Sequence, residues 1–201
     1  GVVAVNAETG ERVELRARSV INATGTWADR LRHEVNPETR VRPLRGSHLV
    51  LARARLPVQD CLTIFHPRDK RPVFAFPWEG ATVIGTTDLD HRQDPDAEAT
   101  ISSDELDYLL EAVNDQFPQR AIGRADIIST WSGVRPVIGS DRSKDPSKER
   151  RNHAVWVDKG LVTVTGGKLT TFRKIALDAI EAATGTLGKL SIVEPGEAVF
   201  A

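Results

Sequence analysis

The chain has 201 residues, enough to bury the core of one or two domains. Its 27 basic and 28 acidic residues give a formal net charge of −1, which argues against a protein that binds nucleic acid over its whole surface. A single cysteine, Cys61, excludes an internal disulfide framework, and no apolar run reaches the ~18 residues that a membrane span needs. The chain contains no methionine and starts on strand-like residues, so we expect a piece of a longer polypeptide.

The beginning of the chain has the pattern of a nucleotide-binding sheet. Residues 2–5 and 13–17 flank a glycine-containing turn and predict a β-hairpin. Residues 19–23 predict a short strand that ends at Gly25, and a helix is expected to begin at Trp27. Strand, glycine turn and helix in this order are typical of the edge of a nucleotide-binding sheet.

From Pro43 the pattern changes to short strands separated by polar turns, which favours an antiparallel sheet. One helix interrupts them, because the capping box Ser102–Glu105 precedes apolar residues at helical spacing that run to Pro118. Pro136 is expected to prevent a regular continuation of the strand before it. The strands predicted in this region cover residues 47–51, 62–65, 73–76, 82–85, 125–131 and 154–157.

After Lys159 the pattern returns to strand, glycine turn and helix. Residues 161–164 predict a buried strand, and a helix is expected from Thr170 to a C-cap at Gly185. The charged segment 141–151 predicts a solvated loop, and the residues beyond Gly185 show no convincing element.

The most specific local motif is Thr165-Gly166-Gly167-Lys168-Leu169-Thr170-Thr171, between that strand and helix. Two glycines allow the backbone to approach a ligand, and a helix N-terminus favours an anionic or electron-rich atom. The motif lacks the first glycine of a phosphate-binding P-loop, and by itself it is equally consistent with a plain strand–helix turn.

Polar residues also stand at the ends of other strands: Arg45-Gly46-Ser47-His48 at the entry to one, and Thr86-Thr87-Asp88 and Arg135 at the ends of two others. Taken separately, these motifs favour turn chemistry and surface charge, although an arginine can bind phosphate or carboxylate bidentately. The five histidines lack the spacing of metal ligands, and no G-x-S-x-G motif supports acyl transfer. A G-x-G-x-x-G dinucleotide motif is also absent from these residues.

Together and in this order, the motifs resemble those of the FAD-dependent (aerobic, respiratory) glycerol-3-phosphate dehydrogenases. The resemblance covers roughly residues 1–185, and the related α-glycerophosphate oxidases share much of it. Its motifs are residues 20–29, 45–48, 76–78, 84–88, 131–136 and 166–173.

The resemblance implies a mixed α/β (α+β) fold like that of D-amino-acid oxidase, in which an antiparallel-sheet substrate domain accompanies a partial FAD-binding domain. The implied domains are residues 1–42 and 159–185 for the FAD-binding part, 43–158 for the substrate domain, and 186–201 for a tail toward a C-terminal domain. The N-terminal G-x-G-x-x-G region is expected to lie outside these residues, so we expect weak or absent FAD binding and no activity by this piece alone.

The resemblance further implies oxidation of sn-glycerol 3-phosphate to dihydroxyacetone phosphate, with hydride transfer from C2 to N5 of FAD and electrons passing to quinone. It implies a homodimer that is cytoplasmic and peripheral on the inner face of the cell membrane, and no nucleic-acid partner.

The residue roles follow from the same resemblance. The catalytic candidates are His48, a proton acceptor, and Arg135 and Lys168, cations beside the substrate. The substrate-binding candidates are Thr86, Thr87, Arg135, Arg151 and Lys168. The cofactor-binding candidates are Ala23, Thr24, Gly25, Trp27, Gly46, Ser47, Gly166, Gly167, Lys168, Leu169 and Thr170.

Two alternatives remain open from the sequence. One is another FAD-dependent oxidase, acting on α-glycerophosphate, an amine or an amino acid. The other is a flavin-free binding or structural module that reuses the fold.

Overall fold

The computed structural model describes residues 1–139, 145–146 and 152–188. The chain divides into two compact units, and each is described by itself. The first unit comprises Gly1–Arg42, Pro136–Asp141 and Glu149–Ala201; the second comprises Pro43–Arg135 and Arg142–Lys148. The change of pattern at Pro43 therefore coincides with a boundary between the units.

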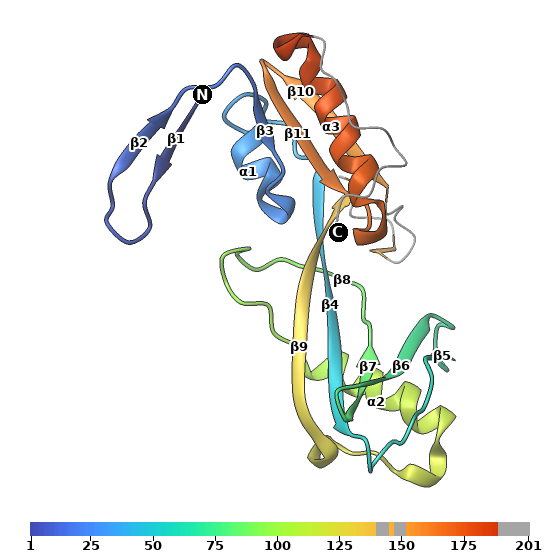
Figure 1. Ribbon diagram of the computed structural model, residues 1–201. Helices are drawn as coiled ribbons and strands as arrows, with labels where there is room; N and C mark the ends of the chain where they lie inside the picture. Colours follow the sequence, from blue (N-terminus) through green and yellow to red (C-terminus); the bar gives the residue numbers. More distant parts are fainter. Residues whose placement is uncertain (140–144, 147–151, 189–201) are drawn as a thin grey trace. The chain divides into compact units, whose positions relative to one another are not determined.

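The first unit contains a hairpin and a three-stranded sheet with two helices (Figure 1). In the sheet β11 is the central strand, antiparallel to β10 and parallel to β3. The elements are β1 (Val2–Val5), β2 (Arg12–Leu15), β3 (Val20–Asn22), α1 (Ala28–Arg32), β10 (His153–Asp158), β11 (Leu161–Gly166) and α3 (Phe172–Leu187).

The strand β10 lies in the first unit, although the sequence had assigned it to the substrate domain ending at residue 158. It pairs with β11 along its whole length, from His153 opposite Gly166 to Asp158 opposite Leu161. The two-residue turn between the strands, Lys159-Gly160, has positive φ at both positions. Such a turn matches the twist of a tight hairpin, so β10 and β11 form one local unit.

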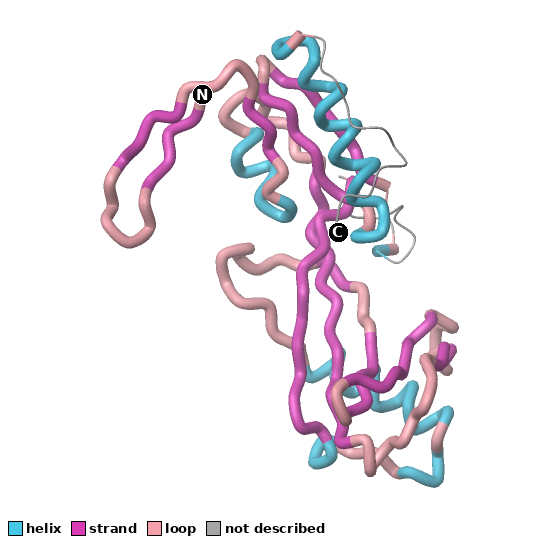
Figure 2. Tube along the Cα trace, viewed as in Figure 1, coloured by secondary structure: helices cyan, strands magenta, loops and turns pink. Residues whose placement is uncertain are grey.

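The second unit is an antiparallel sheet with one long helix, α2. Its strand order is β5-β6-β7-β4-β8, and β9 also pairs with β4. The two longest of the described strands, β4 and β9, have 12 residues each. They pair with each other and form the two long magenta segments of Figure 2. The elements are β4 (Val41–Ala52), β5 (Leu62–Phe65), β6 (Pro72–Trp78), β7 (Ala81–Gly85), β8 (Leu89–Asp90), α2 (Ser103–Gln116) and β9 (Ile127–Ile138). The first two residues of β4 and the last three of β9 belong to the first unit.

The two faces of this sheet differ in character. Leu49, Leu51 and Ile84 on one face are buried in a single apolar core with Leu109 and Val113 of α2. Because side chains alternate along a strand, the neighbours of these residues lie on the opposite face. That face, here called the open face, carries Gly46 and His48 of β4, Gly85 of β7, and the exposed rings of Phe74 and Trp131.

Two sequence predictions about element ends were wrong. β9 continues through Pro136 to Ile138. Among the described strands β9 pairs only with β4, and a strand with one neighbour tolerates a residue that has no N–H. α3 continues through Gly185 and is capped at Gly188, whose φ of +79° ends the helix.

None of the helices in the described residues is long and apolar enough to cross a membrane. Within the same residues, no three His, Cys, Asp or Glu side chains form a group that could hold a metal ion.

We expect Leu109→Ala to lower the free energy of unfolding by about 2–5 kcal/mol, because Leu109 is fully buried in the core beneath the sheet. The matched control is Leu169→Ala, at a leucine that is 89% exposed, for which we expect a change within about 0.5 kcal/mol. Urea denaturation followed by circular dichroism measures both. Equal effects of the two substitutions would contradict this description of the core.

Candidate functional site

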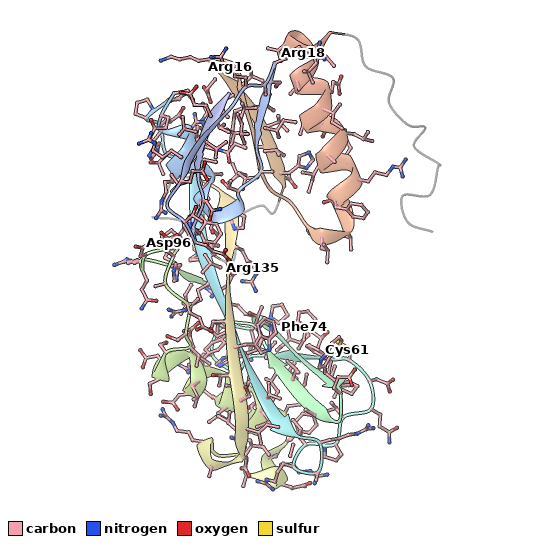
Figure 3. The ribbon with its side chains drawn as sticks, turned by 60° about the vertical axis from the view of Figure 1, so that its left-hand side comes forward. Arg16, Arg18, Cys61, Phe74, Asp96 and Arg135 are labelled. Carbon is pink, nitrogen blue, oxygen red and sulfur yellow. The ribbon has the colours of Figure 1, made fainter. Side chains whose placement is uncertain are left out.

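The guanidinium of Arg135 is held against the backbone of Gly46 on the open face (Figure 3). Its Nη2 donates to Thr86 Oγ1 at 3.0 Å, and its Nη1 donates to Asp88 Oδ1 at 3.2 Å. A Cβ at position 46 would lie only 2.3 Å from Nη2 and 2.4 Å from Nη1, so any other residue there would displace the arginine. The guanidinium of Arg135 therefore lies directly on the backbone of Gly46, a contact that we call the seat of Arg135. Thr86 and Asp88 fix the orientation of the guanidinium.

His48 lies two residues further along β4, in a second seat of the same kind. Its ring is opposite Gly85 of β7, where an added Cβ would lie 2.1 Å from Cδ2. The ring also stacks on Trp131, with centroids 3.7 Å apart and planes inclined by 7°. His48 Nδ1 is buried and has no hydrogen-bond partner among the described residues.

The surroundings of His48 keep its imidazole neutral. Burial, and then the nearby positive charge of Arg135, lower the pKa of His48 from 6.5 to about 4. At neutral pH the ring is therefore unprotonated and able to accept a proton.

Two of the predicted site residues direct their side chains away from the open face. Ser47 Oγ donates to Glu105 Oε1 at 2.8 Å, and Thr87 Oγ1 donates to the same oxygen at 2.7 Å. Both side chains are buried on the side of the sheet that α2 covers. Of the two neighbouring threonines, Thr86 is therefore the one that contacts Arg135.

In the first unit, the predicted cofactor segments meet at one edge of the sheet. β3 and β11 are parallel, so their carboxyl ends lie together, where open α/β sheets bind ligands. Thr165 Oγ1 donates to the carbonyl of Gly25 at 3.2 Å and joins the two segments. The fully buried Asn22 orders the first segment by donating to Ala28 O and accepting from Thr24 Oγ1.

The turn after β11 requires both of its glycines. Gly166 and Gly167 have φ values of +80° and +81°, a region that side chains disfavour. A Cβ at Gly166 would lie 2.7 Å from Asn152 O, and one at Gly167 would lie 2.6 Å from Ile175 Cδ1. The tight turn leads directly into a short 3-10 helix and then α3, with Lys168 and Leu169 exposed.

Beside this turn lies a largely apolar groove with a volume of about 570 Å³. It brings together five of the predicted cofactor residues with apolar residues of the sheet and α3. Its lining is Ile21, Ala23, Val164, Gly166, Gly167, Lys168, Leu169, Phe172, Ile175, Ala176, Ala179 and Ile180.

Apart from Ser47, Thr87 and Arg151, the structure thus gathers the predicted residues into two clusters, one in each unit. Thr86, Gly46, His48 and Arg135 share the open face, while residues 23–27 and 165–170 share the sheet edge. Arg151, another predicted residue, lies outside the described residues.

Sequence reasoning missed other residues of the open face. Trp131 lies within a motif of the resemblance but was given no role, yet it is half exposed and stacks on His48. Asp88 and Gly85 stood within a noted motif, but their contacts with Arg135 and His48 come from distant strands. On the opposite side of the sheet, Glu105 was noted only as part of a capping box, although it binds Ser47 and Thr87.

A glycine turn between the carboxyl end of a parallel strand and a helix is a place where α/β proteins bind nucleotide cofactors. The family model described as FAD dependent oxidoreductase matches residues 1–173, and the chain belongs to this family. Within it, the aerobic glycerol-3-phosphate dehydrogenase of Staphylococcus haemolyticus is 38% identical over 184 residues, which are 90% of this chain and 33% of that protein.

Solved structures agree with this placement. The X-ray structure of the glycerol-3-phosphate dehydrogenase from Bacillus halodurans, complexed with FAD, matches with a TM-score of 0.81 and 32% identity, over 93% of this chain and 36% of that one. Glycine oxidase from Geobacillus kaustophilus shares the fold, with a TM-score of 0.58 at 22% identity over 94% of this chain and 46% of that one. The chain spans about a third of the length of the curated relatives it matches.

We expect Arg135→Gln to raise the pKa of His48 above its value of about 4, because the substitution removes one of the two causes that disfavour the imidazolium. Burial remains, so the pKa should stay below 6.5. An NMR titration of the His48 ring protons in both proteins measures the shift. An unchanged or lower pKa in the variant would contradict the proximity of the two side chains.

Proposed function

We propose that this chain forms the substrate-binding face and part of the flavin-binding edge of an enzyme that oxidises sn-glycerol 3-phosphate to dihydroxyacetone phosphate with FAD. The observation that carries the proposal is the seat of Arg135 beside a neutral His48, in a chain that is 38% identical to an aerobic glycerol-3-phosphate dehydrogenase.

Arg135 suits the phosphate of this substrate. A guanidinium presents planar, paired donors that match phosphate oxygens, and it stays charged at every physiological pH. Thr86 and Asp88 hold it in one orientation before the substrate arrives, so less side-chain entropy is lost on binding. We assign Arg135 to bind the phosphate, with Thr86 as a neighbouring hydroxyl.

We assign His48 to accept the proton of the C2 hydroxyl. Removal of hydride from C2 converts the alcohol to a ketone only if the hydroxyl proton also leaves. The neutral ring of His48 accepts that proton. A dianionic phosphate on Arg135 offsets the positive charge that helps to lower the pKa of His48, so substrate binding makes the ring a better base.

The sheet edge of the first unit suits the flavin. FAD, when bound, supplies the acceptor for the two electrons that leave C2. The double-glycine turn brings backbone close to a ligand, and the start of α3 favours negative charge there. We assign Gly166, Gly167 and Lys168 to the electron-accepting ring, and residues 23–27 to the rest of the cofactor. Additional positive charge from Lys168 and Arg151 at the substrate remains a prediction.

The proposal extends to the partners implied by the sequence resemblance. Quinone is the proposed electron acceptor, and the proposed enzyme is a homodimer, peripheral on the inner face of the cell membrane. Comparing quinone reduction with hydrogen peroxide formation tests the acceptor, because an oxidase passes the same electrons to oxygen.

We expect Arg135→Ala, made in the product of the intact gene, to lower kcat/KM for sn-glycerol 3-phosphate by about 10²-fold or more, since hydrogen bonds between charged groups are lost. Turnover is measured with an artificial electron acceptor. The control is Arg124→Ala, whose side chain is exposed and pairs with Asp107, and which should retain activity. Wild-type turnover in Arg135→Ala would overturn the assignment of the phosphate site.

The seat itself is tested by Gly46→Ala. The added methyl group overlaps the position of the guanidinium, so we expect KM to rise at least tenfold, a change of about 1.4 kcal/mol in binding free energy. Gly133→Ala on β9 is the matched control, because a Cβ there meets no atom within 4 Å. Steady-state kinetics that change equally in the two variants would show that the seat does not control binding.

A further inference from the structure

Glu105 is a carboxylate buried beneath the open face, on the side of the sheet that α2 covers. Only 2% of its surface is exposed. Its Oε2 accepts hydrogen bonds from the backbone N–H and hydroxyl of Ser102 at 2.9 Å each, and from Arg45 Nη2 at 2.5 Å. Its Oε1 accepts from Ser47 at 2.8 Å and Thr87 at 2.7 Å.

These contacts exceed what a helix cap needs. In a capping box the glutamate reaches back to the N-cap residue, here Ser102, and a solvent-exposed side chain can do this. Glu105 in addition binds a side chain from the segment after β7 and two from β4. Ser47 extends the network to β9, since its Oγ lies 2.8 Å from Ser132 Oγ.

The partners of Glu105 alternate with the residues of the open face. Along β4, Ser47 stands between Gly46 and His48. After β7, Thr87 stands between the two residues that hold Arg135, Thr86 and Asp88. Side chains alternate along β4, so the hydrogen bond of Ser47 to Glu105 holds the strand from the side opposite the open face. The hydrogen bond of Thr87 to Glu105 in the same way restrains the two neighbours of Thr87 that bind Arg135.

A second link ties the two segments together. Thr87 Oγ1 accepts a hydrogen bond from the backbone N–H of Ser47 at 2.9 Å while it donates to Glu105. Glu105 therefore sets the direction of the Thr87 hydroxyl, and with it the spacing between the segment that bears Gly46 and the segment that bears Thr86.

We propose that Glu105 is a positioning residue for substrate oxidation, which holds Arg135 and His48 in their seats through Ser47 and Thr87. This inference rests on the proposed function. It gives Glu105 a role in the candidate site in addition to its role in capping the helix α2.

The role depends on the charge of Glu105. Burial raises the pKa of this carboxyl, but hydrogen bonds from Ser102, Thr87, Ser47 and Arg45 outweigh burial and keep the pKa below its usual value. All of these groups act as donors toward Glu105. An amide in its place would direct an NH₂ group at some of them, so glutamine fills the space but cannot satisfy the network.

The test is Glu105→Gln in the product of the intact gene, beside a variant that only weakens the fold. Val113→Ala serves for this, because Val113 is fully buried on the same helix in the apolar core and its side chain has no polar atom that could join the network. We expect Glu105→Gln to lower kcat/KM for sn-glycerol 3-phosphate by about 10²-fold, with both a lower kcat and a higher KM, since small displacements of positioned groups cost about this much. Val113→Ala should change neither constant more than twofold.

An NMR titration of His48 gives a readout that does not depend on turnover. In Glu105→Gln a looser seat admits water and frees Arg135, and both changes raise the pKa of His48 from about 4. In Val113→Ala the pKa should stay the same. Kinetics and a titration that match those of Val113→Ala would overturn the proposal.

Two further outcomes are separated in advance. If Glu105→Gln does not fold, Thr87→Val removes the hydrogen bond from Thr87 to Glu105 and the one from the Ser47 N–H to Thr87, with little change in shape. The same shifts in kinetics and titration are expected, and unchanged values would overturn the proposal. A different outcome concerns the proposed function itself. If the wild-type protein does not oxidise sn-glycerol 3-phosphate, the proposed function is wrong. A shifted His48 titration in Glu105→Gln would then still support the positioning of the two side chains.

Discussion

The arrangement of the second unit depends on one buried anion. A carboxylate that is 2% exposed is stable only when its oxygens receive hydrogen bonds, because an unpaired buried charge is strongly unfavourable. Glu105 meets this requirement with donors from its own helix, from β4 and from the segment after β7. A shift of either strand segment by one residue would replace these donors with side chains from the other face, so the network also specifies strand register.

As a consequence, the two faces of the sheet in the second unit differ in role. One face contributes to stability, and the other carries the candidate functional groups. The face toward α2 holds the apolar core and the polar network, and both are buried and closely packed. The open face holds exposed aromatic rings, a cation and an imidazole, seated on Gly46 and Gly85. Glycines serve here because a flat side chain can lie directly on their backbone. The open face can therefore keep groups that contribute little to folding, because the opposite face supplies the packing.

Sequence reasoning succeeded where the determinants were local. The capping box at Ser102 predicted the start of α2, and the double glycine predicted the turn at residues 166–167. It failed for β9, because whether Pro136 ends a strand depends on how many neighbours the strand has. The contacts of Glu105 with Ser47 and Thr87 join residues 58 and 18 positions apart, and no local pattern encodes them. Arg135 was identified by resemblance, but its seat on Gly46 required the pairing of β9 with β4.

In the proposed phosphate site, the position of a carboxylate, Asp88, beside Arg135 needs a physical explanation. Asp88 offsets part of the charge of Arg135, which by itself weakens attraction for phosphate. An arginine without fixed partners, however, loses about 2 kcal/mol of rotamer freedom when it is immobilised by a ligand. Because Thr86 and Asp88 already hold Arg135, this entropy is lost when the protein folds and not when a ligand binds. The loss therefore lowers the stability of the second unit and does not weaken binding. In the proposed reaction, a fixed position of the guanidinium matters more than the largest possible electrostatic field. The covalent chain of the substrate limits the distance between its phosphate and C2, and His48 has to reach the hydroxyl at C2.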